Sequence, residues 1–588
     1  MCRWPRFPRG SEVPIDTLER VLRYHERTKH QPYRFAPSPG YLDWATQPDP
    51  FRRFAGAPVL DLPFLADGID TLYDELFLPG VARARPLGLE TVAVLFELAL
   101  GLSAWKEFRG ERWALRCNPS SGNLHPTEGY AVVAELAAVP AGLHHYVSRD
   151  HGLEARSILA GPSAARLGEL LGPGRLLVGL SSIHWREAWK YGERAWRYCQ
   201  HDAGHAIAAV RYAAATLGWS ARLLPGLSDE DVSGLLGLER GDDFSTVAPG
   251  DREQPDGLLL VGLPSEIEAA AEEVTSRVEE LLGLVRGGTW AGRANALSPS
   301  HREWPEIEAV TRAAAKPRTR EAGTGTARPG PHPPLPDPLP TSRTSASTLI
   351  RQRRSAVAMD GATGVDVEVF YAMLDRLQPR RATPPWDVLP WPPRVHLALF
   401  VHRVRGLAPG VYLFARDPGA PEALRAVVHA GDTWARPAGC PAHVPLFLLQ
   451  QADCRSASAS VSCHQDIAAD GAFSLAMLAD FRSSLDAGPW WYRRLHWEAG
   501  VVGQVLYLEA EAAGVRSTGI GCYFDDATHG LLGISGDAVQ DLYHFTVGGS
   551  VEDPRLVTLS PYGHVERAGS PGNRLRRDRA RQPDDPRE

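Results

Sequence analysis

The sequence predicts an α+β protein of the three-layer α/β kind, made of two tandem domains with related folds. Three observations lead to this. The 588 residues are too many for one hydrophobic core. A segment of the first half recurs in the second, and a stretch rich in Pro, Gly, Thr and Ser separates the two copies. The expected boundaries are an N-terminal extension at 1–60, domains at 61–290 and 346–565, a linker at 291–345 and a disordered tail at 566–588.

The repeat has a constant offset of 296 residues. Placing residues 197–238 on 493–534 gives 10 identities in 42 ungapped positions, where chance gives roughly three. Each copy predicts a buried Ala-rich helix ended by glycine, then a second helix that opens on an acidic pair and stops at Gly-Leu-Leu-Gly. The expected strands are Tyr130–Ala134, Gly142–Tyr146 and Leu258–Gly262 in the first half, and Val395–Val401, Gly410–Phe414 and Tyr543–Gly548 in the second.

Composition excludes several classes of function. The net charge of −7 arises from 63 basic and 70 acidic residues mixed along the chain, which argues against a nucleic-acid partner. No apolar run is long enough for a membrane span and the N-terminus has no apolar signal segment, so we expect a cytoplasmic protein without a membrane partner. Helical periodicity over Thr17–His30 predicts one further helix, packed on the first domain.

The cysteines and histidines do not indicate a metal site. Seven cysteines without a CxxC pair predict reduced thiols, and the spacing of Cys454, Cys463 and His464 fits no common zinc pattern. His201 and His205 are four residues apart on a helix, superficially like HExxH, but the acid between them is the shorter Asp and no third ligand is evident. We expect no metal.

The first chemically informative string runs from Arg116 to Pro126, with Pro119, Ser120, Ser121 and Asn123 at its centre. Such a cluster forms a turn whose N–H groups and hydroxyls can face a polar ring edge or an anion. The alternative is a plain helix N-cap before His-Pro-Thr-Glu-Gly-Tyr.

The second string, from Arg351 to Ser355, follows the linker and precedes a helical pattern. Two guanidiniums, those of Arg353 and Arg354, with the hydroxyl of Ser355 suit a phosphate monoester. The alternative is a solvated basic patch.

Together these strings resemble the FMN-dependent nitroreductase superfamily, over about residues 60–285 and 346–560. The resemblance implies mainly antiparallel sheets flanked by helices, and two halves packed as an intrachain pseudo-dimer with FMN between them. It also implies roles for individual residues. The phosphate would be held by Arg353, Arg354, Ser355 and Arg555, the isoalloxazine would lie beside Gly519, Ile520 and Gly521, and Arg116, Pro119, Ser120, Ser121 and Asn123 would reach the flavin from the other half.

The two halves carry complementary parts of this signature. The Arg-Arg-Ser string occurs only in the second half and the Pro-Ser-Ser turn only in the first, so one complete site and one degenerate mirror image are expected. Val357 departs from the family pattern, which usually has a further basic residue there.

The first half is similar to SagB-type peptide dehydrogenases, which oxidise azolines to azoles, through R-x-x-P-S and through Lys190 and Tyr191. A Lys-Tyr pair is their proposed acid–base element, since a lysine can ease ionisation of a neighbouring tyrosine. A purely structural role, capping the helix near Arg194, is the alternative.

These observations predict an FMN-dependent oxidoreductase acting on a peptide or small heterocycle. A second hypothesis is NAD(P)H-driven reduction of nitro compounds, quinones or enones. A third is a non-catalytic scaffold in a peptide-modifying complex. Further oligomerisation beyond the pseudo-dimer stays open.

Overall fold

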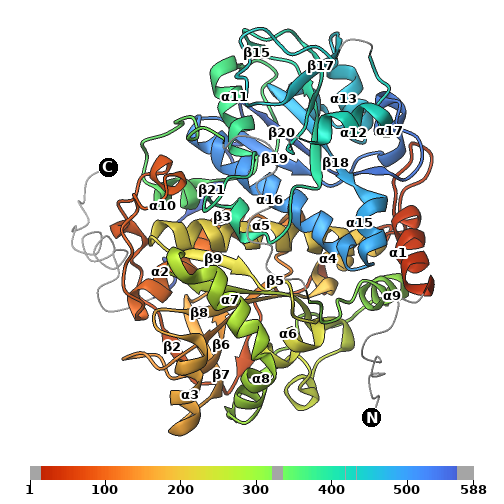
Figure 1. Ribbon diagram of the computed structural model, residues 1–588. Helices are drawn as coiled ribbons and strands as arrows, with labels where there is room; N and C mark the ends of the chain where they lie inside the picture. The colour runs from red at the N-terminus through yellow and green to blue at the C-terminus, as the bar shows by residue number, and fades with distance from the viewer. Residues whose placement is uncertain (1–14, 321–334, 418, 432–433, 566–588) are drawn as a thin grey trace, which may run out of the picture.

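Two antiparallel sheets that share six strands in the same order form the centres of the two halves in the computed structural model, which describes residues 15–320, 335–417, 419–431 and 434–565 (Figure 1). The first sheet has the order β11-β7-β6-β5-β8-β10-β9 and the second β17-β16-β14-β18-β20-β19. The first comprises β11 (Thr289–Trp290), β7 (Gly152–Ile158), β6 (Gly142–Val147), β5 (Thr127–Val133), β8 (Leu176–Ser182), β10 (Gln254–Gly262) and β9 (Ser220–Leu223), with β2 (Val59–Asp61) beside β7. The second comprises β17 (Leu446–Gln451), β16 (Gly410–Phe414), β14 (Val395–Val401), β18 (Phe473–Asp480), β20 (Val539–Gly548) and β19 (Arg516–Ile520). The strands expected from the repeat are confirmed.

Two long helices lie between the sheets and pack against each other: α5 (Ala195–Thr216) and α16 (Trp491–Ala512). Their bounds differ by the repeat offset of 296 at both ends. Gly204 and Gly500 lie where the helices cross. A Cβ on Gly500 would be 2.2 Å from the carbonyl oxygen of His201, so the close approach requires glycine.

The segments after the long helices also correspond. In the first half β9 leads to α6 (Asp229–Leu236), and in the second β19 leads to α17 (Asp525–Leu532). Both short helices begin with acidic residues, which suit the positive end of the helix dipole, and both end at a left-handed glycine, Gly237 or Gly533.

Chain segments cross from one half to the other. The C-terminal strand β21 (Val557–Leu559) adds to the edge of β3 (Leu102–Phe108), which pairs with β4 (Glu111–Arg116) of the first half. The phenol of Tyr562 then accepts a 2.8 Å hydrogen bond from the Leu102 N–H. The C-terminal segment of the second half therefore packs along the edge of the first half's β3–β4 hairpin (Figure 1).

The stretch 291–345, expected to be a linker, contains ordered elements. Strand β12 (Arg293–Ala294) pairs with β1 (Phe54–Ala55), and α9 (Pro305–Ala313) contacts α1 (Ile15–Arg27). Residues 321–334, and the expected tail at 566–588, lie outside the described residues.

The N-terminal helix α1 was expected to pack on the first domain. Its C-terminal turn contacts the second domain as well. Arg27 pairs with Glu193 of the first half at 2.6 Å, while His25 lies 3.1 Å from the Tyr492 hydroxyl of the second. These contacts depend on the tertiary arrangement, which helical periodicity does not encode.

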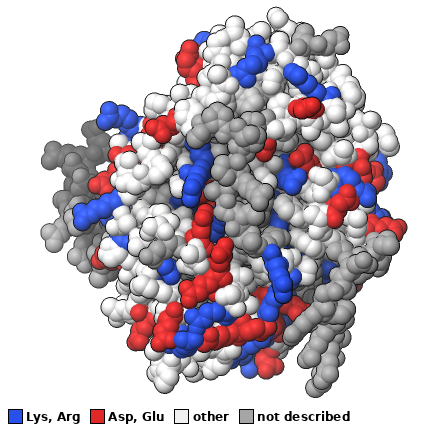
Figure 2. All heavy atoms as spheres, viewed as in Figure 1, with Lys and Arg blue, Asp and Glu red and all other residues white. Residues whose placement is uncertain are grey.

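None of the described helices is long and apolar enough to cross a membrane. Figure 2 shows basic and acidic side chains interspersed over the visible face, in line with the mixed charge of the sequence.

Candidate functional site between the halves

Three of the four predicted phosphate residues, Arg353, Arg354 and Ser355, follow α10 (Ala346–Gln352) at the junction of the halves. The Arg353 guanidinium is 3% exposed, lies 4.8 Å from the ring centre of Tyr507 and donates through Nη2 to the Arg116 carbonyl of the first half at 3.0 Å. Its Nε and Nη1 atoms have no hydrogen-bond partner among the described residues. Buried N–H groups of a cation are costly to leave unpaired, so these atoms suit an anionic ligand.

Ser355 lies next in the chain and extends this group of polar residues toward β19. Its hydroxyl is 2.8 Å from the Tyr507 hydroxyl, which also accepts the Gly519 N–H at 3.2 Å. Ser355 pairs with Ser517 in an isolated parallel bridge, and the buried Ser517 hydroxyl has no partner among the described atoms. Polar hydrogen-bonding capacity therefore gathers between α10 and β19.

Close packing at the Gly519–Gly521 segment leaves no room for side chains. A Cβ on Gly519 would lie 1.9 Å from the Tyr543 hydroxyl, and one on Gly521 would lie 2.6 Å from the Tyr198 ring. The Gly521 carbonyl accepts the Tyr198 hydroxyl at 3.0 Å and Nη2 of Arg194 at 3.2 Å. First-half side chains thus hold this second-half segment.

The Pro-Ser-Ser turn of the first half joins β4 to strand β5, and so is not the N-cap of a helix. Its 3-10 turn η4 (Ser121–Asn123) is fixed by Asp202 of α5, which accepts the N–H and hydroxyl of Ser121, both at 3.0 Å. The Ser120 hydroxyl accepts the His125 N–H at 2.8 Å, and Asn123 donates to the Ala114 carbonyl at 2.8 Å.

Lys190 and Tyr191 end helix α4 (His184–Tyr191) rather than capping α5. The Tyr191 ring is edge-on to Tyr198 at 4.7 Å, and its hydroxyl lies 2.4 Å from where a Cβ on Gly122 would be. Lys190 Nζ lies 5.1 Å from the Tyr191 ring centre. Burial and then the Glu187 carboxyl raise the pKa of Tyr191 well above its usual value, so its hydroxyl stays protonated at neutral pH.

Two acidic residues that sequence reasoning did not select lie beside this tyrosine. Burial raises the pKa of Asp202 to about 7, and burial together with Asp202 raises that of Glu187 well above its usual value. Oε1 of Glu187 is 3.5 Å from the Ser120 hydroxyl, and its Oε2 has no partner among the described residues. The sequence signal that could have found Glu187 is its i, i+4 spacing from Tyr191, which places both side chains on one face of a helix.

A chain of contacts therefore connects the predicted residues of both halves. It runs in the order Ser355, Tyr507, Gly519, Tyr543, His201 along one side, and Gly521, Tyr198, Tyr191, Gly122, Ser121 along the other. The His201 ring stacks on Tyr543 at 4.2 Å, and neither of its nitrogens has a partner among the described atoms.

The structure does not bring every predicted residue into this chain of contacts. Arg555 has a 70% exposed side chain that pairs with Asp553 at 2.7 Å and lies 5.5 Å from Phe108. Arg354 donates to the carbonyls of Arg351, Arg353 and Ser103. The buried guanidinium of Arg116 donates to the carbonyls of Thr127 and Pro50 within the first half. Pro119 is buried directly before the turn, and Ile520 is buried between the two glycines.

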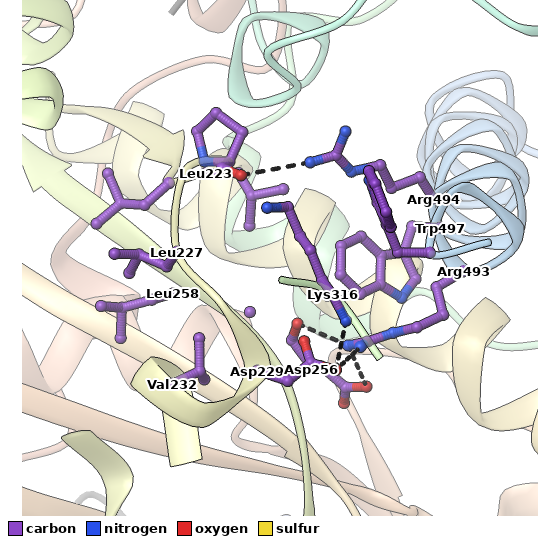
Figure 3. A pocket seen from close by; sticks show the side chains of 14 residues that line it. Leu223, Leu227, Asp229, Val232, Asp256, Leu258, Lys316, Arg493, Arg494 and Trp497 are labelled. Carbon is purple, nitrogen blue, oxygen red and sulfur yellow. Dashed lines mark hydrogen bonds and ion pairs between the residues drawn. The ribbon is translucent and has the colours of Figure 1, made fainter. Parts of the chain in front are cut away.

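The repeat places a second, mirror-related junction on the other side of the helix pair, which we call the mirror pocket (Figure 3). Arg493 pairs with Asp229 there, as Arg197 pairs with Asp525 on the candidate side. The other equivalences follow the offset: Trp490, Arg494 and Trp497 stand for Arg194, Tyr198 and His201, and Leu223, Leu224 and Pro225 stand for Gly519, Ile520 and Gly521.

Bulky side chains fill this mirror pocket. Figure 3 shows Leu223, Leu227 and Leu258 facing Trp497 and Arg494 across it, and the remaining cavity is about 30 Å³. The two junctions have the same backbone plan, but the candidate side has Gly519 and Gly521 where the mirror pocket has Leu223 and Pro225.

No group of His, Cys, Asp and Glu side chains able to hold a metal ion occurs among the described residues. His201 stacks on Tyr543 and His205 contacts the same ring edge-on, while the Cys454 sulfur lies 3.5 Å from Nδ1 of His402 in the second half.

Comparison with known proteins gives three findings. No protein-family model matches the sequence. TfxB, a trifolitoxin-processing protein of Rhizobium leguminosarum bv. trifolii, is 39% identical over 110 residues, which are 17% of this chain and 29% of TfxB. The chain thus matches less than a third of the length of that relative.

Among solved structures, a putative nitroreductase from Anabaena variabilis aligns with 90% of this chain and 99% of its own, at a TM-score of 0.63 and 21% identity. The E. coli microcin synthetase McbBCD complex with truncated pro-MccB17 bound covers 43% of this chain and 83% of its own at 17% identity, but its TM-score of 0.24 is too low to support a conclusion. The near-complete alignment with the Anabaena structure includes both halves. The chain therefore has a nitroreductase-like fold, built as two halves of one polypeptide.

Proposed function

We propose that this protein is an FMN-dependent oxidoreductase that dehydrogenates a peptide or a small heterocycle, in the manner of SagB-type enzymes. The observation that carries the proposal is the buried Arg353 guanidinium, which has two unpaired nitrogens at the junction of the halves. The fold supports the cofactor class. The similarity of one segment to a trifolitoxin-processing protein supports a substrate of peptide origin.

The residues present fit an FMN phosphate and ring. Arg353 and Ser355 would bind the phosphate. Arg354, which hydrogen bonds to backbone carbonyls hold in place, would add a second positive charge. The ring would lie beside Gly519 and Gly521, whose missing side chains let the tyrosines Tyr543 and Tyr198 approach the backbone closely. When bound, FMN would supply a two-electron acceptor.

The first-half residues would manage the proton. The hydroxyl of Tyr191, protonated at neutral pH, can donate a hydrogen bond to a substrate heteroatom. The Asp202 carboxyl, with a pKa of about 7, can hold or release a proton near physiological pH, and Glu187 interacts electrostatically with both Asp202 and Tyr191. Lys190 would contribute positive charge beside the tyrosine ring.

The visible spectrum and a single-turnover assay test this function. The purified protein, reconstituted with FMN, should show bound-flavin absorbance, and anaerobic addition of an azoline-containing peptide should decrease that absorbance as the peptide loses two hydrogens. Decrease of the absorbance by NADPH, without peptide oxidation, would support the reductase hypothesis instead. A protein that never retains flavin would support the scaffold.

A further inference from the structure

Two cysteines from different segments meet at the rim of the candidate site. Cys463 lies between α13 (Arg455–Val461) and α14 (Asp466–Asp470), and Cys522 lies between β19 and α17. Their sulfur atoms are 2.6 Å apart, and both residues are half-buried, so small reagents can reach them. The arrangement brings together two thiols that the sequence separates by 59 positions.

Backbone contacts hold these two segments in place. The Gln465 side-chain amide donates to the carbonyls of Ser462 and Cys522, both at 2.8 Å, and so ties the two cysteine-bearing segments together. Cys463 and His464 have φ of 55° and 57°, a left-handed conformation that residues other than glycine rarely adopt. Such backbone persists where surrounding contacts impose it, often at functional positions.

The surroundings make the two thiols chemically unequal. The hydrogen bond with Cys463 lowers the pKa of Cys522, and the Arg194 guanidinium acts in the same direction, although burial opposes both. The pKa of Cys463 is raised by the same hydrogen bond and by burial. The thiolate is the reactive form of cysteine, so Cys522 is the better nucleophile.

We propose that Cys463 and Cys522 are a redox-active pair that closes reversibly to a disulfide by exchange with a low-molecular-weight disulfide. The Cys522 thiolate attacks the small disulfide, forms a mixed disulfide and releases one small thiol. The Cys463 sulfur then attacks the mixed disulfide at the Cys522 sulfur and releases the second. In total, the protein dithiol is oxidised and one small disulfide is reduced to two thiols. This reaction needs no flavin and is independent of the proposed function.

Thiol counting by mass spectrometry tests the pair. The full-length protein is incubated with glutathione disulfide, quenched with N-ethylmaleimide under denaturing conditions and digested without reductant. We expect two fewer alkylated thiols and a peptide that joins Cys463 to Cys522, both reversed by dithiothreitol. An unchanged thiol count, or a linked peptide that joins other cysteines, would overturn the proposal.

Variants separate the roles of the two sulfurs. C463S should stop at a mixed disulfide, with one glutathione on Cys522, whereas C522S should acquire no glutathione at Cys463 under the same conditions. C440S, which removes another half-buried thiol, should form the internal disulfide normally. Circular dichroism verifies that each variant is folded. Equal glutathione incorporation at Cys463 in C522S would contradict the assignment of Cys522 as the attacking thiol.

Discussion

The candidate site and the mirror pocket are built on one backbone plan and differ in what fills it. On the candidate side, Gly519 faces Tyr543 and Gly521 faces Tyr198. At the mirror pocket, leucine and proline face two tryptophans and leave a cavity of about 30 Å³. Internal duplication therefore supplied two equivalent junctions, which now differ in side-chain volume and in the Arg-Arg-Ser string that only the second half has.

The buried carboxylates at matching positions of α5 and α16 show the same divergence. Asp202 accepts hydrogen bonds from Ser121 and, among the described residues, pairs with no cation. Glu498 accepts the backbone N–H groups of Arg394 and Val395 and pairs with Arg416 at 2.5 Å. Glu498 is therefore engaged in structural contacts, whereas burial raises the pKa of the Asp202 carboxyl to about 7, in the range useful for proton transfer.

The largest expected effect concerns the proposed phosphate site around Arg353 and Ser355, which only the candidate side has. Arg353→Ala should weaken FMN binding by about 100-fold or more, because each charge-assisted hydrogen bond contributes about 1.5–3 kcal/mol. Titration calorimetry with FMN measures the loss. Arg351→Ala, on the same turn of chain but paired with Asp67, is the matched control and should bind FMN nearly as the wild type does. Equal losses of FMN affinity in both variants would show that Arg353 acts only through its general positive charge.

The helix crossing is common to both junctions, so damage there should affect the whole molecule. Gly500→Ala would place a methyl group 2.2 Å from a backbone carbonyl of α5, which cannot move away cheaply. We expect a loss of about 3 kcal/mol in the free energy of unfolding, measured by urea denaturation. Gly530→Ala, on α17 with no atom within 4 Å of the new methyl, should be neutral or slightly stabilising.

The carboxylate comparison predicts a pH dependence. Asp202 has a pKa of about 7 in the folded protein, above its usual 3.8, so its contribution to stability is fully present below pH 3.8 and is lost as the pH rises through 7. Asn does not titrate. The free energy of unfolding of the wild type, relative to Asp202→Asn, should therefore fall by about 2 kcal/mol or more between pH 4 and pH 7. Parallel stability profiles over that range would show that the carboxyl titrates normally.

Much of the fold could be predicted from the sequence because local pattern and repetition determine it. The constant offset between Arg197 and Arg493 located both long helices, and the apolar segments around them located six of the strands, whereas the order of the strands in each sheet came from the structure. The addition of β21 to β3 and the contacts of α1 with both halves depend on tertiary packing, which no local pattern records.

The site was predictable to a lesser degree. Motifs selected Arg353, Ser355 and Ser121, which the structure connects through hydrogen bonds and ring contacts. Motif position did not reveal that Arg555 is exposed, or that burial would bring the pKa of Asp202 near neutrality. Exposure and desolvation are properties of the folded surroundings and are absent from residue spacing.

The smallest expected effect on flavin binding comes from opening the mirror pocket. Trp490→Ala enlarges that pocket and should cost about 2–3 kcal/mol of stability through lost packing, yet it should add no flavin site, since the first half has no Arg-Arg-Ser string. Flavin content per chain, from absorbance and protein mass, measures this. A second bound flavin in the variant would show that volume alone closed the mirror side.

The central claim, that both halves build one flavin site, is tested most directly by titrating the apo-protein with FMN and counting sites. The wild type should saturate at one FMN per chain, and Arg353→Ala and Ser121→Ala, one in each half, should each weaken that same site. Two equivalent sites, or a single site that responds to only one of the two substitutions, would contradict the account.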